Sequence, residues 1–100
     1  MNDTSDPYTY IRGNIVRYTT QTIYGKIENG ELDISKIKEE YGGLIRRLCD
    51  QAKIKVDEDG LKNCFVNLGE KFVTVSEDNI ANVEGFILDN IQNMIQEKKW

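Results

Sequence analysis

The strongest constraint on the fold of this chain is an apolar repeat between residues 33 and 52. Large side chains recur there every three or four positions, at Ile34, Ile37, Tyr41, Leu44, Ile45, Leu48 and Ala52. This spacing places them on one face of an α-helix, and Asp33 is a favourable N-cap. The opposite face carries Lys36, Glu40 and Arg47 and is expected to be solvated. Gly42-Gly43 interrupts the repeat, so either one helix persists or two shorter helices meet there.

Two further segments have helical periodicity. A helix from about residue 7 to 27 is predicted, with Asp6 as its N-cap and Pro7 at its first position. Its apolar arc contains Tyr8, Ile11, Ile15, Tyr18, Thr19, Thr22 and Ile23. The turn after it contains Asn29-Gly30, where glycine favours a helix C-terminus. The last predicted helix begins at the N-cap Ser76. Its apolar face contains Ile80, Val83, Ile87, Ile91, Met94 and Ile95.

The segment from residue 53 to 75 has two interpretations. The favoured one is a short helix over 57–68, with Asp57 as the N-cap, apolar residues at helical spacing and Gly69 at the end. Residues 71–75 then form an extended linker or a short strand. The alternative is a β-hairpin within 61–75, because Lys71-Phe-Val-Thr-Val75 is the most strand-like run in the sequence.

These segments predict a small all-α bundle of three long helices and one short helix. The alternative is an α+β, winged-helix-like fold with the hairpin in 61–75. A chain of 100 residues favours one domain over 1–100. We expect residues 1–6 to be a disordered N-terminus.

Composition argues against most catalytic chemistry. The chain has no histidine, which is the commonest general base and metal ligand, and its two cysteines, Cys49 and Cys64, have apolar neighbours. We expect reduced, buried thiols and no metal site. The loop Asp57-Glu58-Asp59-Gly60 lacks the spacing of a calcium-binding EF-hand, and no phosphate-binding glycine motif occurs. The sequence therefore predicts a protein that is not an enzyme and binds no cofactor.

The hydrophobic content of 39% is typical of a globular protein. No apolar run approaches the roughly 20 residues that a membrane-spanning helix needs. The first residues also lack the basic and apolar regions of a signal peptide. We therefore expect a cytoplasmic protein that does not associate with a membrane.

The net negative charge of the chain lies in its second half. Residues 57–97 contain nine carboxylates and two lysines, whereas the two signs are nearly balanced before residue 57. Such a region favours a basic partner and repels nucleic acid. The predicted acidic surface contains Asp57, Glu58, Asp59, Glu77, Asp78, Glu84 and Asp89. We expect its partner to be another protein, for example a basic or nucleic-acid-binding protein.

Tyrosine and arginine gather in the first half of the chain. Tyr10, Arg17 and Tyr24 are seven residues apart, which places them on one stripe of the first helix, away from its apolar arc. Exposed tyrosine and arginine are enriched at protein interfaces. The favoured hypothesis is a small acidic regulator, inhibitor or subunit of a larger complex that occupies a surface on a macromolecular partner. Self-assembly into a homo-oligomer through the same helices is a further possibility.

The alternative function is DNA binding by a plain or winged helix-turn-helix. A break at Gly42-Gly43 would create a recognition helix over 44–53, with Arg46, Arg47, Gln51 and Lys53 as base and phosphate contacts. The net charge of −4 disfavours this alternative, because domains that follow phosphates are usually basic.

Overall fold

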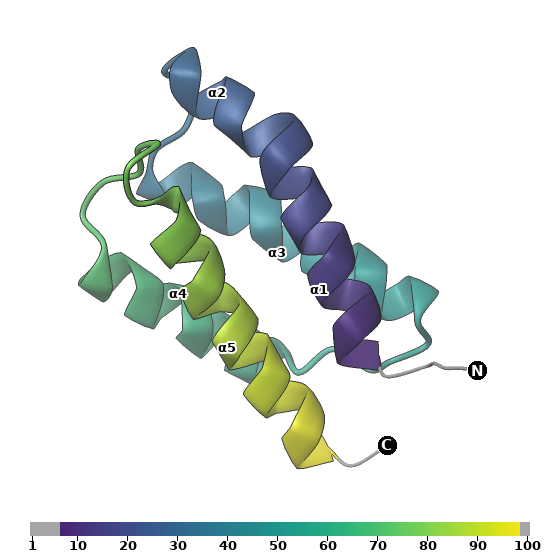
Figure 1. Cartoon of the computed structure of the whole chain (residues 1–100). Helices are drawn as coiled ribbons and strands as arrows, with labels where there is room; N and C mark the ends of the chain where they lie inside the picture. Colours follow the sequence, from purple (N-terminus) through teal and green to yellow (C-terminus); the bar gives the residue numbers. More distant parts are fainter. Residues whose placement is uncertain (1–6, 99–100) are drawn as a thin grey trace.

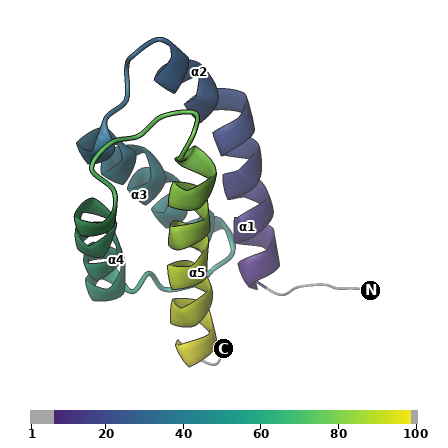
Figure 2. The same ribbon diagram turned by 60° about the vertical axis from the view of Figure 1, so that its left-hand side comes forward.

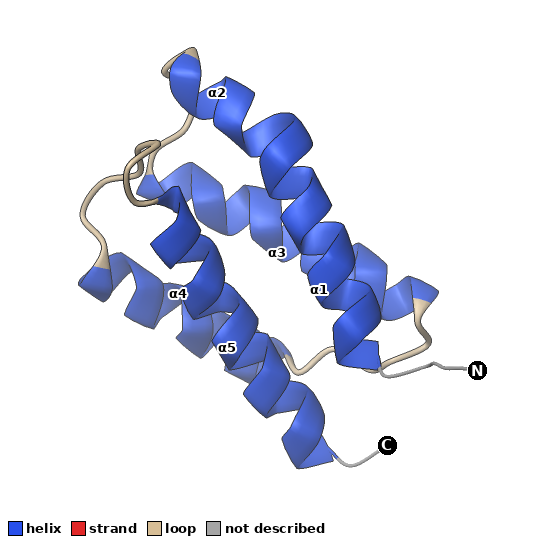
Figure 3. Ribbon diagram, viewed as in Figure 1, coloured by secondary structure: helices blue, strands red, loops and turns tan. Residues whose placement is uncertain are grey.

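The computed structural model describes residues 7–98 and is helical throughout its regular structure. The elements are α1 (Pro7–Tyr18), the π-helical turn η1 (Thr19–Ile23), α2 (Tyr24–Glu28), α3 (Ile34–Gln51), α4 (Glu58–Lys71) and α5 (Ile80–Lys98). The predicted all-α class is confirmed, and no strand occurs within 7–98 (Figure 3). The winged alternative is therefore wrong, because residues 58–71 form a helix. The expectations for residues 1–6, including Asp6 as a cap, lie outside the described residues.

The helices α1, α3, α4 and α5 form a bundle in which each helix packs against two of the others. Helix α1 packs against α3 and α5, and α4 packs against the same two helices. Figure 1 and Figure 2 show that α1, η1 and α2 follow one another as a single long rod, whose α2 end extends away from α4 and α5. The radius of gyration is 13.4 Å, close to the roughly 13 Å expected for 100 residues.

The core is formed by the apolar faces that the sequence predicts. The fully buried side chains come from the α1–η1–α2 rod and from α3, α4 and α5: Ile11, Ile15, Ile23, Ile37, Tyr41, Leu61, Cys64, Leu68, Ile80, Val83 and Ile87. Cys49 is also buried, and both cysteines are free thiols, as predicted. Burial raises the pKa of Cys49, and it raises the pKa of Cys64 to about 11, so both remain protonated and unreactive near neutral pH.

Local signals set most helix ends. The side chains of Asp33 and Asp57 accept hydrogen bonds from the backbone N–H groups of Lys36 and Gly60, so both predicted N-caps are confirmed. Gly30 has a φ of 72° and closes α2, where the N–H of Glu31 reaches the Lys26 carbonyl at 2.8 Å.

Helix α3 runs without a break through Gly42-Gly43, which resolves the question the sequence left open. Gly42 is buried, and a methyl group at its position would lie 3.7 Å from the Phe65 ring of α4. This is an ordinary van der Waals distance, so the position could also hold a small side chain. The continuous helix also removes the predicted helix-turn-helix, which requires a turn at these glycines.

Two predicted boundaries are wrong. Helix α4 continues past Gly69 to Lys71, because the chain leaves the helix only where Phe72 becomes extended and packs against Phe86. Helix α5 begins at Ile80 and not directly after Ser76. The turn before it joins the helix, because the N–H of Ile80 bonds to the Ser76 carbonyl at 2.9 Å. The Ser76 hydroxyl accepts from the N–H of Asp78 and the Asn79 side chain accepts from the N–H of Ser76, so Ser76 makes the predicted capping bond although the helix begins later.

Candidate functional site

The outer face of the α1–η1–α2 rod is the first candidate surface. Tyr10 and Tyr24 remain 44% and 37% exposed, and the Arg17 side chain between them is also exposed. The Tyr10 hydroxyl donates to the Gln51 side chain at 2.9 Å, which ties the start of α1 to the end of α3. Large, partly exposed rings beside a guanidinium offer both apolar area and hydrogen-bonding groups to a partner.

Tyr24 lies on the least buried part of this rod. Helix α2 contains no buried residue, and its last turn is followed directly by the exposed Asn29-Gly30 turn. In Figure 1 this end lies at the top of the molecule, beyond the start of α5. Tyr24, the first residue of α2, is 37% exposed and is therefore partly available to another molecule.

The π-helical turn η1 changes the geometry that the seven-residue spacing predicts. The N–H of Tyr24 bonds to the Thr19 carbonyl, five residues earlier, so the chain takes an extra residue in this turn. Because η1 lies between Arg17 and Tyr24, Tyr24 does not lie on the straight α-helical stripe that Tyr10 and Arg17 share on α1. The three residues instead follow a face that twists at η1.

The pattern of buried residues explains why a wider turn occurs here. Ile11, Ile15, Thr19 and Ile23 are all buried and lie four residues apart. In an α-helix each four-residue step rotates a side chain by about 40° away from the previous one. A turn with more residues reverses part of this rotation, so η1 keeps Ile23 directed toward the core. The sequence showed the four-residue spacing, but the prediction assumed a regular helix.

A buried polar pair accompanies η1. The Thr19 hydroxyl donates to the Ile15 carbonyl at 3.0 Å and lies 2.6 Å from the Tyr41 hydroxyl. Tyr41 is fully buried, and its pKa is raised mainly by that burial. This pair satisfies the hydroxyl of the largest side chain in the core.

A second polar cluster lies beside it and was missed by the sequence interpretation, which placed Glu40 on a solvated face. The Glu40 carboxylate accepts a hydrogen bond from the Tyr18 hydroxyl and an ion-paired contact from Lys26 Nζ at 3.2 Å. Burial together with Glu40 raises the pKa of Tyr18 to about 12, whereas Tyr18 and Lys26 lower the pKa of Glu40. These bonds fasten both ends of η1 to α3.

The predicted acidic surface is divided between two ends of the molecule. Asp57, Glu58 and Asp59 lie at the start of α4, whereas Glu77 and Asp78 lie in the turn before α5 and beyond the other end of α4. Helix α4 has 14 residues and therefore separates these groups by about 20 Å. Glu84 and Asp89 lie on α5. The seven residues do not form one continuous acidic face.

The residues of the DNA-binding alternative lie on the second half of α3 and just after it. Arg46 makes hydrogen bonds to both carboxylate oxygens of Glu58, the shortest at 3.0 Å, and Gln51 accepts from Tyr10. Arg47 is exposed, and Lys53 follows α3 with a φ of 60°. Two of the four residues are thus already engaged within the protein, and the turn and the wing that would present them are missing from residues 7–98.

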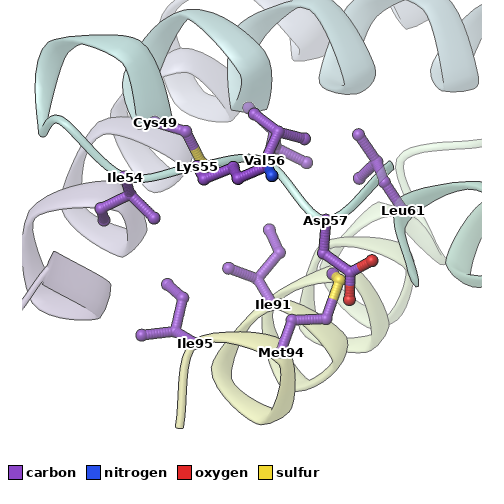
Figure 4. Close-up of a pocket in the computed structure, with 10 residues that line it drawn as sticks. Cys49, Ile54, Lys55, Val56, Asp57, Leu61, Ile91, Met94 and Ile95 are labelled. Atoms are coloured by element: carbon purple, nitrogen blue, oxygen red, sulfur yellow. The ribbon is translucent and has the colours of Figure 1, made fainter. Parts of the chain in front are cut away.

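A small apolar cavity lies near the end of α5 (Figure 4). It has a volume of about 30 Å³ and lies between Cys49, the segment 54–57 and the side chains of Ile91, Met94 and Ile95. This volume suits one or two water-sized groups and is far smaller than a typical ligand pocket. Within the described part of the chain, no three Cys, Asp or Glu side chains gather as metal ligands would, and no helix has the length and apolar content to span a membrane.

Comparison with protein-family models, with curated proteins and with solved structures gave no match for this chain. The proposals that follow therefore depend on the geometry described above.

Proposed function

We propose that this protein is a non-catalytic binding module that acts by occupying a surface on another macromolecule, as a regulator, an inhibitor or a subunit of a complex does. The observation that carries the proposal is the exposure of Tyr10, Arg17 and Tyr24 along the α1–η1–α2 rod. Tyrosine and arginine provide a large share of the binding energy at interfaces when a partner covers them. Tyr10 and Arg17 lie on α1 and Tyr24 lies on α2, along a face of the rod that twists at η1.

The carboxylates favour a basic partner, including a nucleic-acid-binding protein. Net charge and the local excess of acid after residue 57 raise the rate of encounter with a positively charged surface. The proposal therefore assigns two roles: the rod supplies the contact, and the acidic groups at both ends of α4 steer the approach.

The test compares two sets of variants as bait in lysate of the source organism. One set carries Tyr10→Ala, Arg17→Ala and Tyr24→Ala together. The matched control carries Lys38→Ala, Lys62→Ala and Val66→Ala, three residues that are also exposed but lie on α3 and α4. We expect the rod variant to lose a partner that wild type and the control both retain. Each single rod substitution should weaken the purified complex by about 1 to 3 kcal/mol.

Tyr10→Phe separates binding from structure, because it keeps the ring and removes only the hydrogen bond to Gln51. Equal capture by wild type and the rod variant would reject the rod as the contact surface. Self-assembly is distinguished by measuring the mass in solution over a range of protein concentrations: a dimer that the rod variant abolishes would identify the partner as a second copy.

A further inference from the structure

The turn that ends α2 contains the dipeptide Asn29-Gly30, which the function proposed above does not use. Asn29 is the only asparagine of the chain that glycine follows. In such a dipeptide the glycine nitrogen can attack the carbon of the asparagine side-chain amide, because glycine has no side chain to hinder the approach. A larger residue follows every other asparagine and hinders the same attack. The chemistry of the chain therefore singles out Asn29.

This dipeptide lies at the surface of the molecule. Asn29, Gly30 and Glu31 are all exposed, so water and hydroxide reach them. The Asn29 side-chain amide donates a hydrogen bond of 3.3 Å to the Glu31 carboxylate. A bond of this length between exposed groups is weak and does not fix the amide in place.

Backbone hydrogen bonds close the end of α2 around the dipeptide. The N–H of Gly30 donates to the Ile27 carbonyl at 3.0 Å, and the N–H of Glu31 donates to the Lys26 carbonyl at 2.8 Å. The nitrogen of Gly30 must leave Ile27 before it can attack the Asn29 side chain. The reaction therefore requires the last turn of α2 to open.

Helix α2 has few contacts that oppose this opening. It has five residues and none of them is buried. The ion pair that ties Lys26 to Glu40 of α3 is itself partly exposed, at 36% and 25% of the two side chains. Short helix ends with little buried area open locally at a small cost in free energy, without unfolding of the whole domain. The native protein therefore visits the open turn.

We propose that Asn29 is a site of spontaneous deamidation in the folded protein. Hydroxide removes the proton from the Gly30 nitrogen, which forms a bond to Cγ of Asn29. The bond from Cγ to Nδ2 breaks, and the amide nitrogen takes a proton from water and leaves as ammonia. One water molecule then opens the resulting succinimide at either carbonyl and yields aspartate or isoaspartate. This chemistry needs no partner, so it is independent of the function proposed above.

Either product weakens the end of α2. A carboxylate at position 29 stands between Glu28 and Glu31 at a helix C-terminus, where the helix dipole disfavours negative charge. Isoaspartate also adds a methylene group to the backbone before Gly30. The N–H groups of Gly30 and Glu31 are then displaced from the carbonyls of Ile27 and Lys26. The modification therefore unwinds the last turn of α2.

The test incubates the full-length protein at mildly alkaline pH and follows each asparagine by peptide mapping and mass spectrometry. We expect Asn29 to convert faster than every other asparagine, and isoaspartate to appear among the products. The same chain unfolded in urea is the positive control for the reaction. The variant Asn29→Gln should form no product at this position. The variant Asn29→Asp should exchange the backbone amide of Glu31 faster than wild type, because the closing bond to Lys26 is weakened.

Two alanine variants separate local opening from global unfolding. Gly25→Ala adds a methyl group in open space within α2 and favours the helix, so it should slow the conversion about two- to fivefold. The matched control is Gly13→Ala, which makes the same change in open space on α1 and should leave the rate unchanged. Lys26→Met removes the ion pair with Glu40 and should speed the conversion by up to about fivefold.

Three results would overturn the proposal. An intact Asn29 in the folded protein, under conditions that convert the unfolded chain, would show that the turn protects it. Equal slowing by Gly25→Ala and Gly13→Ala would show that the reaction proceeds through the unfolded chain. Faster conversion of any other asparagine would place the reactive site elsewhere.

Discussion

The buried contact between Thr19 and Tyr41 gives a prediction whose sign depends on which hydroxyl donates. The Thr19 hydroxyl has one proton and directs it to the Ile15 carbonyl at 3.0 Å. The Tyr41 hydroxyl, 2.6 Å away, must therefore be the donor in the contact between the two side chains. Removing the donor and removing the acceptor then have different consequences for the folded protein.

Tyr41→Phe removes the donor and leaves no buried proton without an acceptor. The expected cost is that of one net hydrogen bond, about 0.5 to 1.5 kcal/mol of the free energy of unfolding. Thr19→Val keeps the shape but leaves the fully buried Tyr41 hydroxyl without its partner, which should cost about 1 to 3 kcal/mol. The double variant removes both polar groups, so it should cost no more than Thr19→Val alone.

The assay is urea unfolding followed by far-ultraviolet circular dichroism for the wild type, the two single variants and the double variant. Tyr10→Phe is the control, because it removes an exposed hydrogen bond and should change stability by less than about 0.5 kcal/mol. We expect a coupling energy between the two sites of at least about 0.5 kcal/mol. Additive costs, or a smaller cost for Thr19→Val than for Tyr41→Phe, would refute the assignment of the donor.

Three further predictions follow from the helix ends and the polar cluster. Because the pKa of Tyr18 is raised to about 12, the stability that Tyr18 contributes is complete below the ordinary tyrosine pKa near 10 and is lost as the pH rises toward 12. Tyr18→Phe should remove the phenolate absorbance that appears near pH 12 and should reduce the loss of stability at alkaline pH. Lys53→Gly should stabilise the fold by up to about 1 kcal/mol in thermal unfolding, since the φ of 60° is unfavourable for lysine; a lower melting temperature would contradict this. Gly60→Ala should lower the free energy of unfolding by about 1 to 3 kcal/mol, because the added methyl group would lie 2.7 Å from the Met94 sulfur and 2.6 Å from the capping carboxylate of Asp57. Gly69→Ala, in open space, should instead raise it by up to about 1 kcal/mol, and a change of the same sign in both variants would contradict this prediction.

The sequence predicted best where a feature depends on neighbours along the chain. The caps Asp33 and Asp57, the turn at Gly30 and the apolar face of α3 all depend on residues a few positions apart, and all are confirmed. The boundary at Gly69 was predicted wrongly because a glycine in a helix is a weak stop signal when the next residues pack. Helix α4 ends only where Phe72, the extended residue after it, packs against Phe86 of α5.

The candidate surfaces also differ in whether they depend on neighbours along the chain or on contacts between helices. Position on the helical wheel predicted an outward direction for Tyr10, Arg17 and Tyr24, and these side chains are exposed. The groove lined by Phe72 and Phe86 was not predicted, because the two rings are 14 residues apart in the sequence and meet only after α4 and α5 pack. The run from Lys71 to Val75 has the composition of a strand, whereas in the structure Lys71 ends α4 and Phe72 lines a groove beside α5.

The π-helical turn links the core to the rod surface. At the start of η1, Thr19 bonds to Tyr41 of α3 and Tyr18 bonds to Glu40 of α3. Lys26, which follows η1 in α2, contacts the same Glu40 carboxylate. An isolated π turn is a rare conformation that reverts to α-helix unless other contacts compensate. If these contacts were lost, η1 would rewind by one residue and rotate Tyr24 relative to Arg17. The angle between the two exposed side chains is therefore set by buried and half-buried hydroxyls, and partner binding should be sensitive to Thr19 even though a partner cannot touch it.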